Sequence, residues 1–132
     1  MIVHLPSYGD TKHVRYVQID PHDTWGMDST LATLIVPMLK QLRQTKHGVP
    51  SQFVEIDPDS QGVFDFIDKD VEFEVGVKKW ESLIDQMIWS FSKVQESNWG
   101  YDNIPAAQYK AHQERIQTGL DLFANHFGSL WD

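Results

Sequence analysis

The chain has no cysteine among its 132 residues, which excludes disulfide frameworks, zinc–thiolate sites and thiol catalysis. No apolar run comes near the roughly 18 residues that cross a membrane, so we expect no membrane partner. No basic and then apolar leader follows Met1, and a cytoplasmic protein is therefore expected.

The sequence also lacks the short motifs of common catalytic and nucleotide-binding sites. It contains no nucleophile elbow, P-loop, glycine-rich dinucleotide turn or His-Glu-x-x-His pattern. Its six histidines are scattered and never recur at metal-ligand spacing on one helix face. We therefore expect a protein that is not an enzyme and that uses neither a cofactor nor a bound metal.

What the chain does have is apolar and aromatic residues. Hydrophobic residues make up 41% of the sequence, and there are five Trp, seven Phe and four Tyr. Disordered chains have low hydrophobicity, so this composition predicts a folded protein. The length suits one domain, residues 1–132, with a single core.

Negative charge is concentrated in one stretch. Residues 51–75 hold eight Asp and Glu against Lys69, a net charge of −7, out of −8 for the whole chain. No broad basic stripe is present to follow a phosphate backbone, so duplex nucleic acid is not an expected partner. The acidic segment, residues 51–76, is predicted to be irregular or to form a short hairpin through residues 71–75.

Periodicity predicts an α+β fold, with an N-terminal β-hairpin or small sheet packed on three amphipathic helices. Residues 1–20 have strand and turn composition, and residues 21–26 form a break. Helices are expected from this break to about residue 47, over about 77–96, and from about 106 to the end. The expected core rows of the first two helices are Leu31, Leu34, Ile35, Met38, Leu39 and Leu42, then Trp80, Leu83, Ile84, Met87, Ile88, Phe91 and Val94.

A calcium-loop pattern begins at Asp57 and ends at Asp68. Its spacing matches positions 1, 3, 5, 6, 9 and 12 of an EF-hand. Position 5 is Gln61, and position 12 lacks the bidentate Glu of that motif, so a solvated acidic loop is the simpler interpretation.

The turn at residues 20–25 is dense in polar chemistry. Asp20 and Asp23 can cap a helix, which is the common role of such residues, or can hold a metal together with His22. Trp25 can stack on a planar base, or it can pack against the start of the helix as a hydrophobic staple.

Two features do not fit an isolated helical bundle. Trp89 projects opposite the apolar face of its helix, so it is covered by another copy, by another segment of the chain, or by a ligand. On the first helix, Lys40, Arg43 and His47 share the face away from the leucines and form a basic ridge. Such a ridge is either a solvated surface or a site for phosphate.

Several blocks of the sequence resemble a family of short proteins encoded by many tailed phages. They include Asp23-Thr24-Trp25-Gly26-Met27-Asp28, Pro37-Met38-Leu39-Lys40-Gln41-Leu42 and residues 46–50, 83–91 and 114–123. The family in turn resembles phage sponge proteins, which sequester the cyclic nucleotide signals of host defence without cleaving them. The resemblance implies a homo-oligomer in the host cytosol that binds a cyclic oligonucleotide second messenger.

Such a ligand offers flat bases and phosphates, which aromatic rings and Arg or Lys side chains bind. Two alternatives stay open: an interaction protein that binds a host or phage protein through the Trp89 helix face, and a metal-dependent hydrolase using Asp20, His22, Asp23 and Asp85. The candidate ligand-binding residues are Trp25, Arg15, Tyr16, Lys40, Arg43, His47 and Trp89.

Overall fold

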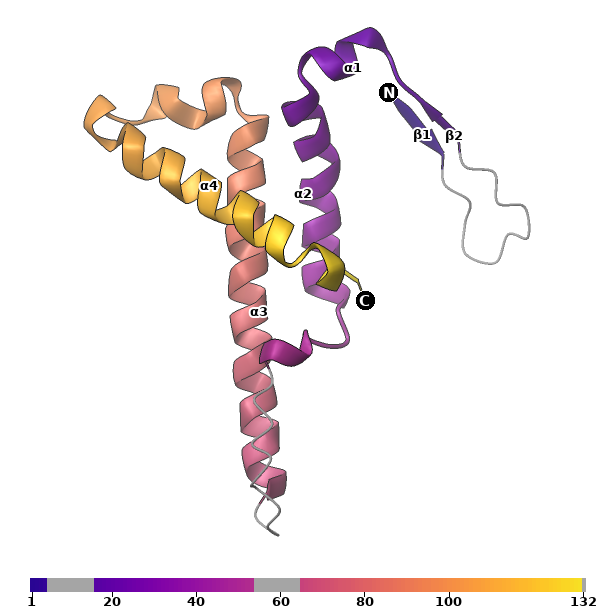
Figure 1. The fold of residues 1–132 in the computed structure, drawn as a ribbon, viewed down its shortest axis with the longest axis vertical. Coiled ribbons are helices and arrows are strands. Elements are labelled where there is room, and N and C mark those ends of the chain that lie inside the picture. The colour runs from indigo at the N-terminus through magenta and orange to yellow at the C-terminus, as the bar shows by residue number, and fades with distance from the viewer. Residues whose placement is uncertain (5–15, 54–64, 132) are drawn as a thin grey trace.

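The computed structural model describes residues 1–4, 16–53 and 65–131 (Figure 1). It confirms the α+β class, with a small N-terminal sheet followed by helices. Strands β1 (Ile2–His4) and β2 (Tyr16–Gln18) pair antiparallel, with Val3 opposite Val17. All six strand residues are exposed, so the sheet adds nothing to the core.

A short helix replaces the break expected at residues 21–26. Helix α1 (Pro21–Trp25) begins with proline, whose fixed φ suits a first helical turn. The Asp20 side chain accepts from the His22 N–H at 2.9 Å, and the Asp23 side chain accepts from the Asp20 N–H at 2.7 Å. This reciprocal capping box explains the helix and confirms the capping role of both carboxylates.

Three longer helices form the body of the molecule, with α3 packed against both α2 and α4 (Figure 1). Single 3-10 turns precede α3 and flank α4, and a longer 3-10 segment connects the two helices. The bounds are α2 Met27–Thr45, η1 Ser51–Phe53, α3 Asp65–Gln95, η2 Ser97–Asn103, η3 Ala106–Gln108, α4 Tyr109–Asn125 and η4 Phe127–Ser129.

Helix α3 begins about twelve residues earlier than expected. The prediction of an irregular segment or hairpin over residues 65–76 is therefore wrong, because this part of the acidic segment is helical. Extending an existing helix requires no new nucleus, so a strongly helical stretch can propagate through an alternating sequence. Apolar and acidic residues alternate over residues 71–75, a spacing that does not form one apolar face on a helix. Phe73 and Val75 are therefore left 44% and 46% exposed. Asp65 and Asp68 of the calcium-loop pattern lie in α3, and residues 57–64 lie outside the described part.

The core is formed where α2, α3 and α4 meet. On α3 the expected row is confirmed for Trp80, Ile84, Met87, Phe91 and Val94. On α2 the expected row is confirmed at Leu39, which is buried, and at Ile35, which packs against the core, but it is wrong at Leu31, Leu34 and Met38. The buried residues of α2 are Ala32, Val36 and Leu39, whereas Leu31, Leu34 and Met38 are 40%, 39% and 69% exposed.

Helices α3 and α4 cross in close contact at Gly119. A Cβ placed on Gly119 would lie 2.0 Å from the Ser90 Oγ and 2.6 Å from the Gln86 carbonyl oxygen. Ser90 is fully buried, and its hydroxyl donates to the Arg115 carbonyl at 3.2 Å. The missing side chain therefore fixes where α4 lies on α3.

In the described part of the chain, no helix is both long and apolar enough to cross a membrane.

Candidate functional site

A hollow of about 470 Å³ lies beside Trp89, between α3, α4 and η2. We call it the Trp89 hollow. Its polar lining comes from three Lys, His or Arg side chains and two side-chain amides, and the remaining lining residues are apolar or glycine. The lining residues are Trp89, Lys93, Gly100, Asn103, Ile104, Gln108, Ala111, His112 and Arg115.

The Trp89 ring is covered by its own chain, which decides between the three interpretations left open by the sequence. The Arg115 guanidinium carbon lies 3.7 Å from the Trp89 ring centroid, and the His112 ring meets it edge-on at 5.6 Å. Both residues belong to α4. Trp89 is half-buried against the core, so its own chain covers part of the ring that the second hypothesis gives to a protein partner.

Arg115 forms a flat cationic surface backed by an aromatic ring. Among the described residues, no carboxylate pairs with it, and its contact is the cation–π stack on Trp89. Its planar guanidinium presents several N–H donors and a positive charge to the hollow. The Ser90 hydrogen bond to the Arg115 carbonyl holds the backbone of this residue in place.

Backbone strain lies next to the hollow. Asn98, Trp99 and Gly100 of η2 are consecutive left-handed residues, with φ of 52°, 52° and 78°. For a bulky residue such as Trp99 this is an outlier, which persists only where surrounding contacts fix it. The Trp99 indole N–H donates to Asp28 at 3.1 Å, and its carbonyl accepts from His112 Nε2 at 2.9 Å.

Those contacts also set the state of His112. A carbonyl oxygen only accepts, so Nε2 carries a proton and donates it to Trp99. Nδ1 is the ring nitrogen outside this hydrogen bond. Lys93 also lines the hollow, and its Nζ is paired with Glu96 Oε1 at 2.8 Å. Arg115 is therefore the lining cation that no described carboxylate pairs with.

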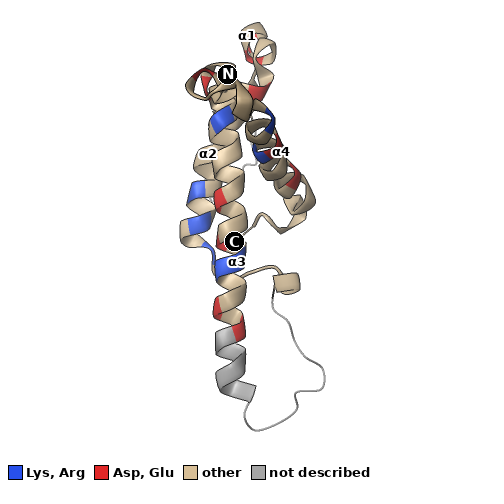
Figure 2. Cartoon of the chain, turned by 90° about the vertical axis from the view of Figure 1, so that its left-hand side faces the viewer, with Lys and Arg blue, Asp and Glu red and all other residues tan. Residues whose placement is uncertain are grey.

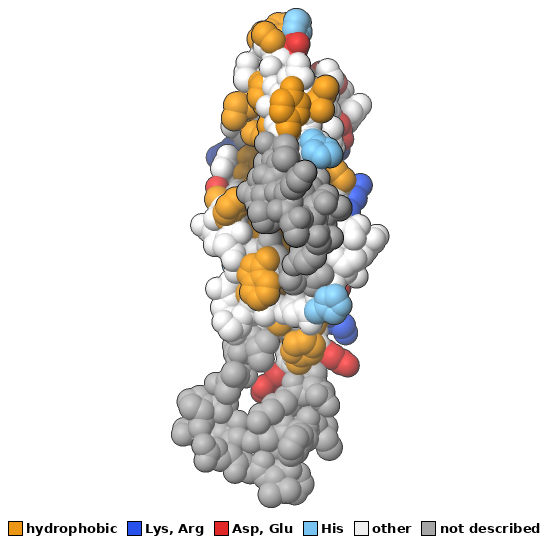
Figure 3. All heavy atoms as spheres, turned by 90° about the vertical axis from the view of Figure 1, so that its right-hand side faces the viewer, with side chains coloured by type: hydrophobic (Ala, Val, Ile, Leu, Met, Phe, Trp, Pro, Cys, Tyr) orange, Lys and Arg blue, Asp and Glu red, His pale blue; other side chains and the backbone are white. Residues whose placement is uncertain are grey.

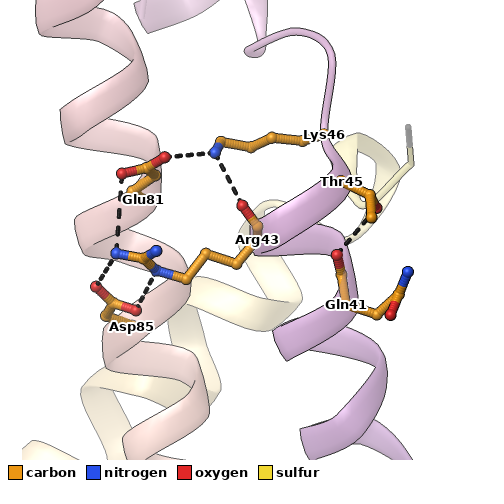
Figure 4. A network of polar contacts seen from close by, with 6 residues as sticks. All are labelled: Gln41, Arg43, Thr45, Lys46, Glu81 and Asp85. Carbon is orange, nitrogen blue, oxygen red and sulfur yellow. Dashed lines mark hydrogen bonds and ion pairs between the residues drawn. The ribbon is translucent and has the colours of Figure 1, made fainter.

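The predicted basic ridge on α2 is tied to α3 by an ion-pair network (Figure 4). Arg43 donates to both Asp85 oxygens, at 2.6 and 3.1 Å. Lys46 donates to Glu81 Oε1 at 2.6 Å, and the Arg43 guanidinium is 3.8 Å from the other Glu81 oxygen. The hydrogen bond with Asp85 raises the pKa of Arg43, and the hydrogen bond from Lys46 lowers the pKa of Glu81.

Charge on this face is consequently paired between helices. Figure 2 shows basic residues on the C-terminal half of α2 beside acidic residues of α3. Lys40 and His47 are exposed, while Arg43 gives its planar fork to a carboxylate. The ridge is not a free phosphate-binding surface, because a ligand phosphate would have to compete with Asp85 and Glu81 for Arg43.

The other candidates from the sequence are not brought to the Trp89 hollow. Trp25 is 87% exposed and its ring meets the edge of His22 at 6.1 Å, so the staple interpretation is wrong. Tyr16 is 51% exposed on β2 and donates to Gln18 at 3.0 Å. Arg15 lies outside the described residues.

Two carboxylates of the hypothetical metal site, Asp23 and Asp85, are bound to other groups of the chain. Asp23 binds the Met1 amine at 2.9 Å as well as the Asp20 N–H, and the pKa of Asp23 is lowered by that backbone hydrogen bond and then by the amine. Asp85 is held by Arg43. Within residues 1–4, 16–53 and 65–131, no three His, Asp or Glu side chains converge to hold a metal.

Sequence reasoning found Trp89 but missed the residues around it. Lys93 follows Trp89 by four positions, and His112 and Arg115 are three apart, so each spacing places its pair on one helix face. That signal was available, but nothing in the sequence indicated that α4 lies against the Trp89 side of α3. No family model matches the chain, and neither does any curated protein or solved structure.

Proposed function

We propose that the protein binds a cyclic oligonucleotide signal of host defence in the Trp89 hollow and sequesters it without cleaving it. The observation that carries this proposal is the Arg115 guanidinium stacked 3.7 Å from the Trp89 centroid at the wall of the hollow. The resemblance of the chain to tailed-phage proteins supplies the biological setting.

Each part of the ligand has a group that can bind it. Bases stack on aromatic rings and on Arg guanidinium planes, and each stacked base contributes about 1–3 kcal/mol. The outer face of Arg115 is such a plane, and Trp89 is the ring behind it. Asn103 and Gln108 offer amide donors and acceptors, the groups that recognise base edges.

Phosphates would be bound by Arg115, because no described carboxylate pairs with it, whereas Lys93 is already paired with Glu96. Charge-assisted hydrogen bonds of this kind are about twice as strong as neutral ones. The volume of about 470 Å³ falls within the roughly 300–1,000 Å³ of small-molecule sites. A cyclic dinucleotide can therefore enter with at least one base and its phosphate.

Sequestration is favoured over cleavage by the composition of the hollow. Phosphodiester cleavage needs a positioned base or metal-bound water, and metal sites need carboxylate or imidazole ligands. No carboxylate is found among the described residues of the lining, and His112 Nε2 donates to the Trp99 carbonyl. His112 Nδ1 alone is a poor substitute for a two-group acid–base pair.

The test is to incubate the protein with labelled cyclic dinucleotides and trinucleotides of adenine and guanine, separate bound from free ligand, and then denature the protein. We expect intact cyclic ligand to be recovered in stoichiometric amount. Recovery of linear product would show an enzyme, and the absence of binding to every member of the panel would rule the proposal out.

A further inference from the structure

One face of α2 is apolar, exposed and unused by the core. Met27, Leu31, Leu34 and Met38 are 56%, 40%, 39% and 69% exposed. Their spacing of four, three and four residues places them in one row along the helix, the pattern of a helix–helix seam. We call this row the α2 seam. Figure 3 shows exposed groups of hydrophobic side chains on this side of the molecule.

The seam is continuous with an apolar hollow of about 850 Å³ between α2 and the C-terminal residues. Met38 and Leu42 line one wall, and Phe127, Leu130 and Trp131 line the other. Phe127 and Trp131 are 66% and 75% exposed, leaving about 300 Å² of ring surface uncovered, given roughly 150–250 Å² per aromatic side chain. With the seam, this patch approaches the about 800 Å² per partner of a standard interface.

We propose that the α2 seam and this hollow form the interface of a two-fold symmetric homodimer in which the two α2 helices run antiparallel. Among the described residues, none that lines the hollow is charged, and the charged residues of α2, Asp28, Lys40 and Arg43, project away from the seam. Most of the net charge of −8 lies in residues 51–75, outside the seam, so two copies that meet through the seam place little like charge in the contact. A strongly charged partner would find no complementary charge there.

The face is also complementary to itself, which a two-fold interface requires. It carries projecting side chains at Leu31 and Leu34 and a hollow beside Met38. An antiparallel arrangement with the two-fold axis between Leu34 and Met38 sets Leu34 against Met38 of the second copy and Leu31 against Gln41. The projecting leucines of each copy then lie over the hollow of the other.

Light scattering over a range of protein concentrations tests the dimer. We expect a mass twice that of the 15.3 kDa chain at high concentration. In Leu34→Glu, two charges are moved into an apolar contact, so the dimer dissociation constant rises by roughly 100-fold or more. The control is Phe73→Glu, at a similarly exposed apolar residue of α3, which should leave the dimer intact.

Cross-linking tests the register, since the natural chain has no cysteine to interfere. An equimolar mixture of Leu34→Cys and Met38→Cys chains should form disulfide-linked pairs that contain one chain of each kind, and more of them than either variant alone. A strict monomer at every concentration, a dimer unaffected by Leu34→Glu, or a mixture with no excess of mixed pairs would each overturn the proposal. None of these outcomes depends on whether the Trp89 hollow binds a ligand.

Discussion

Arg115 of α4 stacks on Trp89 of α3, with 3.7 Å between the guanidinium carbon and the ring centroid. One turn along α4, Gly119 lies against Ser90, the residue that follows Trp89. The stack therefore depends on how closely the two helices approach, and the geometry of the hollow depends on the packing of the core beneath it.

Gly119→Ala should destabilise the protein. The added methyl would overlap the Ser90 side chain and the Gln86 carbonyl, and overpacking of this kind typically costs about 1–3 kcal/mol. Urea unfolding measures the change. Gly128→Ala is the matched control, because a Cβ there meets nothing within 4 Å, and its free energy of unfolding should stay close to that of the natural chain. Equal effects of the two substitutions would contradict the close crossing.

The α2–α3 ion pairs predict a pH dependence of stability. Lys46 lowers the pKa of Glu81 below its ordinary value of 4.5, so the folded state holds this carboxyl ionised more firmly than the unfolded state does. The stabilisation is complete above about pH 4.5 and is lost as the pH falls through the lower folded-state pKa. Because the pair is partly exposed, its contribution is small, about 1 kcal/mol or less.

Glu81→Gln isolates that contribution. The free energy of unfolding of the natural chain should fall more steeply below pH 4.5 than that of Glu81→Gln, and the two curves should converge in acid. Parallel curves across this range would show that the Lys46–Glu81 pair does not stabilise the fold.

Asp20 and Asp23 should act as helix caps, with no dependence on a metal. Asp20→Ala removes the N-cap of α1, and losses of this kind cost about 0.5–2 kcal/mol of helix stability. Hydrogen exchange at the His22 and Asp23 amides measures the local effect, which should be faster exchange in the variant. Addition of EDTA should leave exchange in the natural chain unchanged, and protection that depends on a metal would revive the hydrolase hypothesis.

The sequence predicts where the helices lie better than it predicts which face of each helix packs against another. Periodicity identifies the buried row of α3 because Trp80, Ile84 and Met87 lie in one continuous apolar row. It fails in part on α2 because that helix has two adjacent apolar rows, and only the packing shows that Ala32 and Val36, not Leu31 and Leu34, face α3.

The candidate site shows the same limit. Trp89 is recognisable from its position on the polar side of α3, but the cation above it comes from a residue 26 positions later. Arg43 looks available in the sequence because Asp85 lies 42 residues away, and only the folded chain brings the two together. Charge that appears free along a helix is often neutralised by its neighbour.

The most direct test of the proposed function is the affinity of site variants for a cyclic dinucleotide that the natural chain binds. Arg115→Ala should lower the affinity at least tenfold, about 1.4 kcal/mol, because the variant loses both a stacking plane and a charge. Lys110→Ala removes an exposed cation from the same helix outside the hollow and should bind like the natural chain. Equal affinities for Arg115→Ala, Lys110→Ala and the natural chain would contradict the account.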